Sequence, residues 1–191
     1  MQIHELKLPD QAESIGALRA GQRVRLSGQL VTARCRVHKA LLDGLNSPIK
    51  LEGAAIIHSS PVIVRDGAQW VVRALGPSGS ALVDAYVPPF IERYRVRVII
   101  GMGSLGDATR RACERFGCVY LQTVGGVASK QAETIRSVAG VHFLREFGAA
   151  DAMWVLEVEG LEALVAIDTS GRSLHRRVQI SSRRAMARLL A

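Results

Sequence analysis

A glycine-rich turn at residues 101–106 is the first feature of the sequence that could do chemistry. Its residues, Gly-Met-Gly-Ser-Leu-Gly, have the spacing G-x-G-x-x-G, follow a predicted strand at 95–100 and precede a predicted helix at 107–117. Such a turn presents backbone N–H groups at a helix N-terminus, where a phosphate or a carboxylate is stabilised. Gly101, Met102 and Gly103 are therefore candidate binding residues for an anion.

Two features argue against dinucleotide binding at this turn. The β-α-β unit starts near residue 95, and the strand after it ends in Gly125-Gly126 with no acidic residue to hold ribose hydroxyls. Glycines also permit a tight strand-to-helix turn for steric reasons alone. A purely structural turn and an anion-binding turn both fit these residues.

The cysteines and histidines do not form a metal-binding pattern. Cys35, Cys113 and Cys118 are odd in number, which favours reduced thiols and a cytoplasmic protein over a disulfide framework. Cys113 and Cys118 lie on a predicted helix and at its exit, as packing residues do. We interpret His58 and His142 as structural residues.

The charge of the chain points to an anionic partner. The formal net charge is +8, with a pI near 10.1, and five arginines fall at positions 176, 177, 183, 184 and 188. They could line the solvent face of a terminal helix or bind an acidic surface. Aromatic residues make up only 5%, which argues against a nucleic-acid recognition surface.

Length and hydropathy bound the architecture. A chain of 191 residues with 48% hydrophobic residues is suited to one domain, with a core at 8–175 and a basic helix at 176–191. No window approaches 18 uninterrupted apolar residues, and the start lacks the pattern of a secretion signal. We therefore expect a cytoplasmic protein that is not bound to a membrane.

The predicted elements indicate an α/β fold with a mixed sheet, antiparallel in its N-terminal part and β-α-β in its C-terminal part. The pattern predicts a short opening helix, with Asp10 as a possible cap and Gly21 as its stop. Asp66-Gly67 predicts a hairpin, and Pro88-Pro89 the start of a helix. The other predictions are strands at 23–34 and 118–126, helices at 36–45 and near 130–140, a strand or helix at 153–161, and a strand at 162–171.

Four segments, taken in order, resemble the beta subunit of L-tartrate dehydratase and the C-terminal domain of class I fumarases. They are LSGQLVTARCRVHKALL, IIHSSPVIVRDGAQWVVRALGPSGSALVDAY, GMGSLG and VYLQTVGG. The resemblance implies a swivelling β/β/α domain that works with an alpha-type partner, in which three cysteines hold a [4Fe–4S] cluster. Water is then added to or removed from a small carboxylate substrate at the junction, and the chain alone holds no cluster.

The resemblance assigns site residues to this chain. Arg34 and His38 stand where the family has an arginine and a histidine, and an arginine can pair with both oxygens of a carboxylate. Ser78 and Ser80 stand in the family's hydroxyl-rich second motif and are candidate hydroxyl donors. Without the resemblance, Arg34 would be read as a surface charge and His38 as an ordinary helix residue.

The chain departs from the family at several motif positions, and Ser78 stands in place of the first of two threonines. Gly79 replaces a threonine whose hydroxyl is associated with proton transfer, and Leu82 replaces an arginine. Met102 replaces the lysine of Gly-Lys-Gly, and Cys35 replaces an aspartate. Two of these changes remove positive charge, so we expect a remodelled pocket and a less anionic substrate than tartrate or fumarate.

Three functions follow from the residues. The first is a hydro-lyase subunit, in a homo- or hetero-oligomer, that acts on a hydroxy acid. The second is a catalytically silent interaction or regulatory subunit that keeps the fold, because such a subunit would also lose polar site residues. The third, which rests only on charge and the glycine turn, is a nucleotide- or nucleic-acid-binding protein.

Overall fold

Strand β2 (Arg23–Thr32) organises the main sheet of the computed structural model, which describes residues 2–9 and 12–190. It pairs in parallel with β1 (Ile3–Leu8) and, further along, with β3 (Ala55–Ile57). The parallel series continues through β6 (Val98–Gly101) and β7 (Val119–Gln122). Strands β2, β3, β6 and β7 therefore end at one edge of the sheet, and the segments that follow them meet there.

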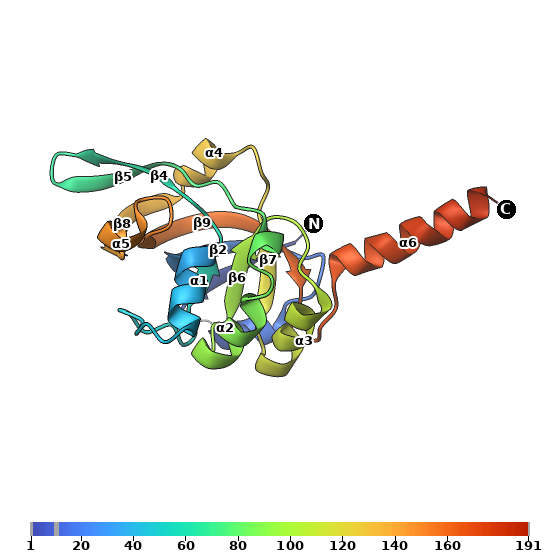
Figure 1. The fold of residues 1–191 in the computed structure, drawn as a ribbon. Coiled ribbons are helices and arrows are strands. Elements are labelled where there is room, and N and C mark those ends of the chain that lie inside the picture. Colours follow the sequence, from blue (N-terminus) through green and yellow to red (C-terminus); the bar gives the residue numbers. More distant parts are fainter. Residues whose placement is uncertain (1, 10–11, 191) are drawn as a thin grey trace.

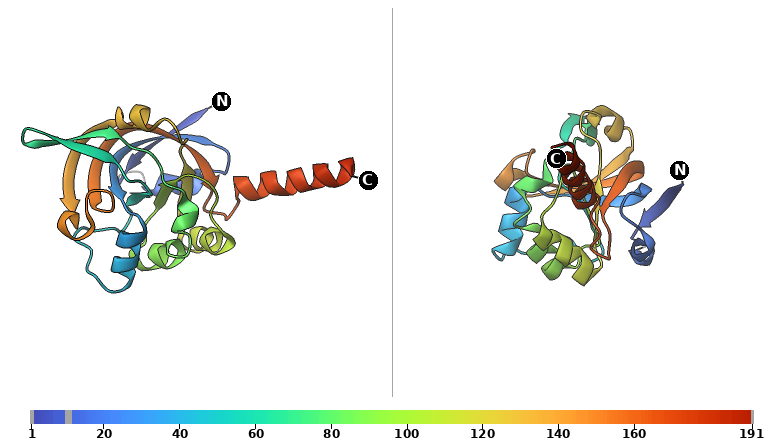
Figure 2. Two further views of the ribbon diagram at one scale, coloured as in Figure 1. Left: turned by 45° about the horizontal axis from the view of Figure 1, so that its top comes forward. Right: turned by 90° about the vertical axis from the view of Figure 1, so that its right-hand side faces the viewer.

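Strand β9 (Met153–Ile167) closes this sheet. It runs antiparallel to β2, to β7 and to β8 (Ile135–His142). Because β2 pairs with both β3 and β9, the strands β2, β3, β6, β7 and β9 form a closed circuit. Figure 2 shows the strands curving around this circuit, with β8 beyond β9 at the end of the sheet. Closure leaves fewer unpaired strand edges than an open sheet would have.

Helices α1 (Cys35–Leu42), α2 (Val87–Tyr94) and α3 (Asp107–Phe116) cover one face of the parallel strands (Figure 1). Alternating strand residues feed two apolar cores. Ile56, Ile99 and Tyr120 pack with the helices, whereas Ile57 and Ile100 pack in the other core. Burial on both faces explains why these strands are continuous apolar runs in the sequence.

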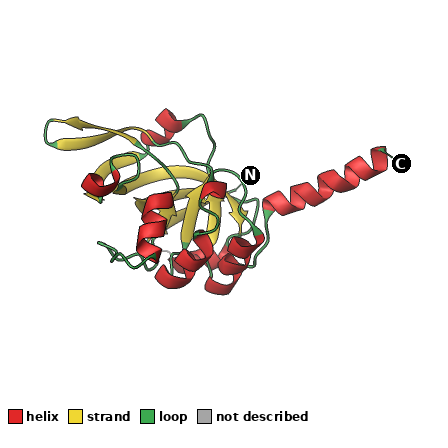
Figure 3. Cartoon of the chain, in the orientation of Figure 1, coloured by secondary structure: helices red, strands yellow, loops and turns green. Residues whose placement is uncertain are grey.

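The other elements are shorter or lie outside the main sheet, as Figure 3 shows by colour. A two-stranded hairpin joins β4 (Val62–Asp66) to β5 (Gln69–Ala74), and Trp70 of the hairpin stacks edge-on against Trp154, with ring centroids 5.2 Å apart. The remaining short elements are η1 (Ala12–Ala17), η2 (Ser80–Leu82), α4 (Ala128–Ala132) and α5 (Leu144–Phe147).

Helix α6 (Leu174–Leu189) extends away from the rest of the chain (Figure 1). None of its described residues is buried. The arginines of the predicted basic helix therefore lie on an exposed helix, in agreement with the sequence pattern. In the described part of the chain, no helix is long and apolar enough to cross a membrane.

Most local predictions are confirmed. The structure contains the strand at 23–32, the helix that starts beside Pro88-Pro89, and the hairpin around Asp66-Gly67. The β6-α3-β7 unit is the predicted β-α-β unit, with its two strands parallel.

Several predictions are wrong or incomplete. The N-terminal strands β1, β2 and β3 are parallel, so antiparallel pairing there is limited to the separate β4–β5 hairpin and to β2 against β9. The opening helix is only the 3₁₀ segment η1, and the suggested cap Asp10 lies outside the described residues. The helix near 130–140 is short α4 followed by β8, because pairing with β9 outweighs the helical composition.

The two segments expected at 153–161 and 162–171 are one strand, β9. Gly160 interrupts the alternation of apolar residues and has a positive φ of 80°. Its N–H donates to Ser27 Oγ at 3.0 Å, and the β2–β9 register shifts nearby, between Leu26 and Gly28. The glycine therefore marks a bulge within one strand, and not a strand end.

A buried threonine should contribute measurably to closure. Thr32 Oγ1 donates to Ala152 O at 3.1 Å and accepts from Trp154 N at 2.9 Å, so it ties β2 to the start of β9. Thr32→Val leaves both backbone groups unpaired in the core and should lower the free energy of unfolding by about 1–3 kcal/mol. Urea denaturation measures this change. Thr32→Ser keeps the hydroxyl and is the control; equal losses in both variants would contradict the assignment.

Candidate functional site

The predicted site residues meet at the edge where the parallel strands end. Arg34 follows β2, and the turn 101–103 follows β6. The 76–82 turn crosses between them: Ser78 N donates to His58 O at 2.6 Å, and Ser80 N donates to Met102 O at 2.9 Å. Closeness in space thus comes from the parallel topology, although the segments are far apart in the sequence.

Arg34 is held by an ion pair. Its Nη1 lies 3.2 Å from Asp151 Oδ1, and the two side chains are 31% and 25% exposed. This pair fixes the direction of the guanidinium while leaving its other donors for a ligand. The adjacent Cys35 Sγ donates to Leu82 O at 3.5 Å, which places the start of α1 against the 80–82 turn.

A chain of buried polar groups anchors the 76–82 turn. His58 Nδ1 lies 2.9 Å from Ser80 Oγ, which in turn lies 3.1 Å from Tyr120 Oη. Tyr120 Oη also donates to Gly103 O at 2.8 Å. Because that carbonyl can only accept, the Ser80 hydroxyl is left to donate to Tyr120, and His58 Nδ1–H donates to Ser80. Burial is the main reason that the pKa of Tyr120 is raised to about 12.

Ser78 and Ser80 differ in accessibility. Ser80 is fully buried and engaged in this hydrogen-bond chain, whereas Ser78 is half-buried at the sheet edge. Gly101 is required by the same packing, since a Cβ there would collide with Ser80 Oγ. The sequence did not predict the contributions of His58 and Tyr120, because their partners lie on other strands and turns.

His38 lies in the core beneath the edge. Its side chain is fully buried. The centroid of its ring lies 4.4 Å from that of Phe90 and 5.3 Å from that of His58. Neither ring nitrogen has a hydrogen-bond partner among the described residues. Burial, and secondarily the neighbouring His58, holds the pKa of His38 well below its usual value, so the ring is neutral.

The helix that follows the glycine turn already has an anion at its N-terminus. Asp84 Oδ2 accepts from Gly106 N at 3.0 Å, and Asp84 Oδ1 accepts from Thr109 Oγ1 at 2.6 Å. A Cβ on Gly106 would come within 2.6 Å of the carboxylate, so this glycine is needed for the contact. The carboxylate takes the position that a phosphate would occupy in a dinucleotide site, which argues against that interpretation.

Apolar side chains are exposed around the candidate site. Leu82 is 70% exposed, Val124 is 68% exposed and Met102 is 37% exposed. Met102 lies beside both neighbouring turns: it bridges to Gly79, and its Sδ is within 2.8 Å of a Cβ placed on Gly125. The edge therefore combines one guanidinium with apolar surface. Leu82 and Met102 are two of the residues at which the chain departs from the family pattern.

The cysteines are not arranged to hold a cluster. Cys113 and Cys118 are buried in the helix-side core, and Cys35 is at the start of α1. Among the described residues, no group of three or more His, Cys, Asp or Glu side chains could hold a metal ion. Burial raises the pKa of Cys118 well above its usual value, so this thiol stays protonated and is a poor ligand.

Comparison with known proteins identifies the family of this chain. The family model described as "Fumarase C-terminus" matches residues 2–178. The chain is 37% identical over 178 residues to a protein of Geobacillus stearothermophilus that is provisionally named a class I fumarate hydratase. It is 32% identical over 172 residues to the L(+)-tartrate dehydratase subunit beta of Escherichia coli K12.

The extent of these matches shows which family the chain belongs to. The first match covers 93% of this chain but only 34% of the Geobacillus protein, so the chain spans about a third of that relative. The second covers 88% of this chain and 85% of the Escherichia coli subunit. The chain belongs to the fumarase C-terminal domain family, which includes beta subunits of tartrate dehydratases.

The two buried histidines should make stability depend on pH. Burial lowers the pKa of His58 to about 3, and the pKa of His38 is also well below 6.5, whereas both would be near 6.5 when unfolded. Below pH 6.5 only the unfolded chain takes up these protons, so stability is constant above about pH 7 and falls toward pH 5. The slope should approach about 1.4 kcal/mol per pH unit for each histidine.

Urea unfolding at pH 5, 6, 7 and 8 measures this slope. His38→Leu removes one titrating group without breaking a hydrogen bond of the described structure, because neither nitrogen has a partner. The variant should lose about half of the acid-dependent slope contributed by the pair. An unchanged slope would show that His38 is not held neutral.

Proposed function

We propose that this chain is the beta-type component of a hydro-lyase that adds water to, or removes it from, a hydroxy acid. The observation that carries this proposal is the convergence of Arg34, Ser78 and the 101–103 turn at one sheet edge. Family membership supports the class of chemistry. On this proposal residues 1–191 act as one domain that swivels against its partner, as expected from the resemblance.

Arg34 is the proposed carboxylate-binding residue. Its ion pair with Asp151 uses Nη1 and leaves further N–H donors on the guanidinium. A planar guanidinium can bind both oxygens of one carboxylate, which fixes the orientation of the substrate as well as its position. Asp151 would then position Arg34 without touching the substrate.

Ser78 is the better of the two candidate hydroxyls for contact with the substrate. It is half-buried, whereas Ser80 is enclosed and hydrogen-bonded to His58 and Tyr120. We assign Ser80 to positioning: it holds the 76–82 turn against β6. His38 would likewise support the start of α1 from below, since its ring is buried and neutral.

The proposed pocket is less cationic than the family pattern. Leu82 and Met102 stand where that pattern has an arginine and a lysine, and both are exposed. One guanidinium and the backbone of residues 101–103 remain to bind negative charge. This supports a substrate with one strongly bound carboxylate and an apolar portion next to Leu82 and Met102.

A partner must complete such a site. The described residues of this chain do not fit an iron–sulfur cluster, so we place the [4Fe–4S] cluster on an alpha-type subunit. The exposed apolar residues at the edge are suited to contact with that subunit in a homo- or hetero-oligomeric assembly. Cytoplasmic location remains part of the proposal.

A catalytically silent subunit is the second candidate function. The observation that favours it is the replacement of side chains that could bind or transfer protons by Gly79, Leu82 and Met102. Such a subunit would use the same apolar edge to bind the alpha-type partner and regulate it. The two functions differ in whether loss of Arg34 changes turnover.

Arg34→Ala should reduce turnover in the assembled enzyme. The chain is co-expressed anaerobically with an alpha-type subunit, and hydroxy and unsaturated carboxylic acids are screened for reversible water addition. Loss of one charge-assisted contact should lower kcat/KM about 10- to 100-fold. Arg34→Lys keeps the positive charge but not the planar guanidinium; it is the matched control and should recover part of the loss. Activity of the chain alone would contradict the proposed need for a partner.

The two serines should separate catalysis from stability. Ser78→Ala should lower turnover of the complex and leave the midpoint of urea unfolding nearly unchanged. Ser80→Ala should lower the free energy of unfolding by about 1–3 kcal/mol, because it leaves buried His58 Nδ1–H without an acceptor and removes one of the two partners of Tyr120 Oη. If Ser78→Ala had full activity, the assignment of its hydroxyl would be wrong.

A further inference from the structure

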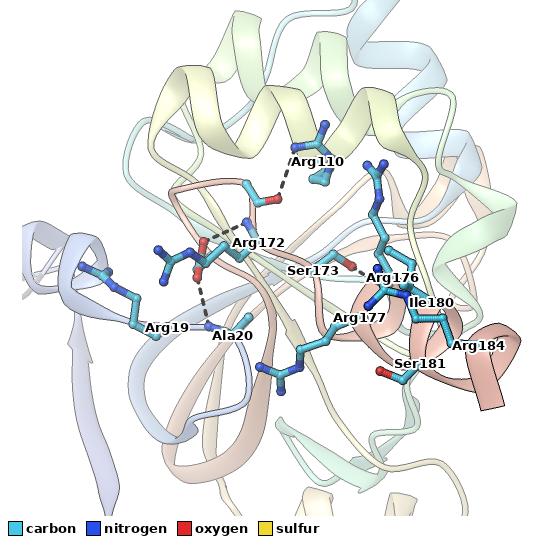
Figure 4. A pocket seen from close by; sticks show the side chains of 12 residues that line it. Arg19, Ala20, Arg110, Arg172, Ser173, Arg176, Arg177, Ile180, Ser181 and Arg184 are labelled. Carbon is cyan, nitrogen blue, oxygen red and sulfur yellow. Dashed lines mark hydrogen bonds between the residues drawn. The ribbon is translucent and has the colours of Figure 1, made fainter. Parts of the chain in front are cut away.

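Arginines from four segments surround one pocket at the base of α6, shown in Figure 4. The pocket has a volume of about 530 Å³. The turn before β2, helix α3, the loop after β9 and helix α6 form its walls. Its guanidinium-bearing residues are Arg19, Arg110, Arg172, Arg176, Arg177 and Arg184.

The pocket is separate from the proposed hydro-lyase site. Arg34, Ser78 and Met102 are not among its lining residues. Part of its α6 wall also lies beyond the family match, which ends at residue 178 whereas α6 continues to Leu189. A ligand in this pocket would therefore be a property additional to the proposed function.

One carboxylate, that of Asp168, lies in the pocket wall among the arginines. Asp168 is fully buried and accepts from three backbone N–H groups: Ala20 at 3.1 Å, Ser170 at 2.9 Å and Arg172 at 3.0 Å. These bonds hold the loop after β9 against the turn before β2. Asp168 thus orders the backbone of the pocket, and its charge offsets that of one of the six guanidiniums.

Two of the six guanidiniums have a carboxylate partner at the rim. Arg110 and Arg176 both lie 3.1 Å from Asp107 Oδ1. The other four have no carboxylate within 4.0 Å in the described part of the chain; they are Arg19, Arg172, Arg177 and Arg184. With Asp107, Glu114 and Asp168 set against the six arginines, about three positive charges around the opening remain uncompensated.

We propose that this pocket binds a small molecule with two or more phosphate groups. A di- or triphosphate carries about three or four negative charges in a small volume, which matches the uncompensated guanidiniums better than a dicarboxylate does. Guanidiniums bind phosphate oxygens with paired, charge-assisted hydrogen bonds. The volume lies within the range of small-molecule sites and exceeds the needs of a single phosphate ion.

Other occupants fit the charge less well. A second copy of this chain would bring like charges together at the same surface. A nucleic acid needs an extended basic surface, commonly with aromatic stacking residues, whereas these arginines line one cavity. A lining drawn from four segments favours a compact polyanion.

Calorimetric titration of the full chain with inorganic triphosphate and with ATP, at 50 and 200 mM KCl, tests this site. Arg172→Ala and Arg177→Ala should each weaken binding about 10-fold or more, because each removes a charged hydrogen bond. Arg188→Ala removes the same charge from the same helix without lining the pocket, and should change affinity less than about 2-fold. Urea unfolding of each variant verifies that the fold is retained.

The outcomes separate a built site from general attraction. Loss confined to Arg172→Ala and Arg177→Ala supports the pocket, and partial recovery by Arg172→Lys supports its fork geometry. An equal loss in Arg188→Ala, or no binding of either phosphate compound, would overturn the proposal. Equally tight binding of a tricarboxylate would also overturn it. So would tighter binding of a single-stranded RNA whose affinity is unchanged in Arg177→Ala. None of these results depends on hydro-lyase activity.

Discussion

Pairing of β2 with β9 is the constraint on which the rest of the structure depends. Without it, β2, β3, β6 and β7 would form an open parallel sheet with β2 near one edge. With it, the strands close into a circuit, and their carboxyl ends are held around one small area. The Thr32 hydroxyl and the bulge at Gly160 accommodate this pairing where the two strands differ in curvature and register.

Buried polar groups beneath the sheet edge hold the turns there in fixed positions. The chain from His58 through Ser80 and Tyr120 to Gly103 ties the 76–82 turn and the glycine turn to strand β7 and to the end of β3. Asp84 does the same for the glycine turn and α3. Because buried polar groups are costly when unpaired, these contacts favour one arrangement of the turns over others. The candidate residues Arg34 and Ser78 lie on top of this arrangement.

The sequence predicted what local chemistry determines. Asp66-Gly67 specifies a hairpin, Pro88-Pro89 suits a first helical turn, and the apolar run before Gly101 suits a strand buried on both faces. The resemblance then placed Arg34 and Ser78 in one site, and the structure brings them to one edge. Their catalytic roles stay predictions.

The features that the sequence did not predict depend on contacts between distant parts of the chain. The parallel partner of β1 is the next strand, β2, beyond the η1 segment. The partner of β8 is β9, where Gly160 N bonds to Ser27 of a distant strand. His58 and Asp151 gave no local signal of a role, since each acquires its partner only through folding. A single sequence encodes such pairings through burial patterns that many registers can satisfy.

The distribution of charge separates two surfaces of the molecule. At the sheet edge, Leu82, Met102 and Val124 are exposed beside a single guanidinium. At the base of α6, six arginines line one pocket and outnumber the carboxylates beside them. Exposed apolar groups are stabilised by a partner or an apolar ligand that removes them from water, whereas unpaired guanidiniums are stabilised by an anion. The net charge of +8 is therefore unevenly distributed. The proposed hydro-lyase edge is the less cationic of the two surfaces.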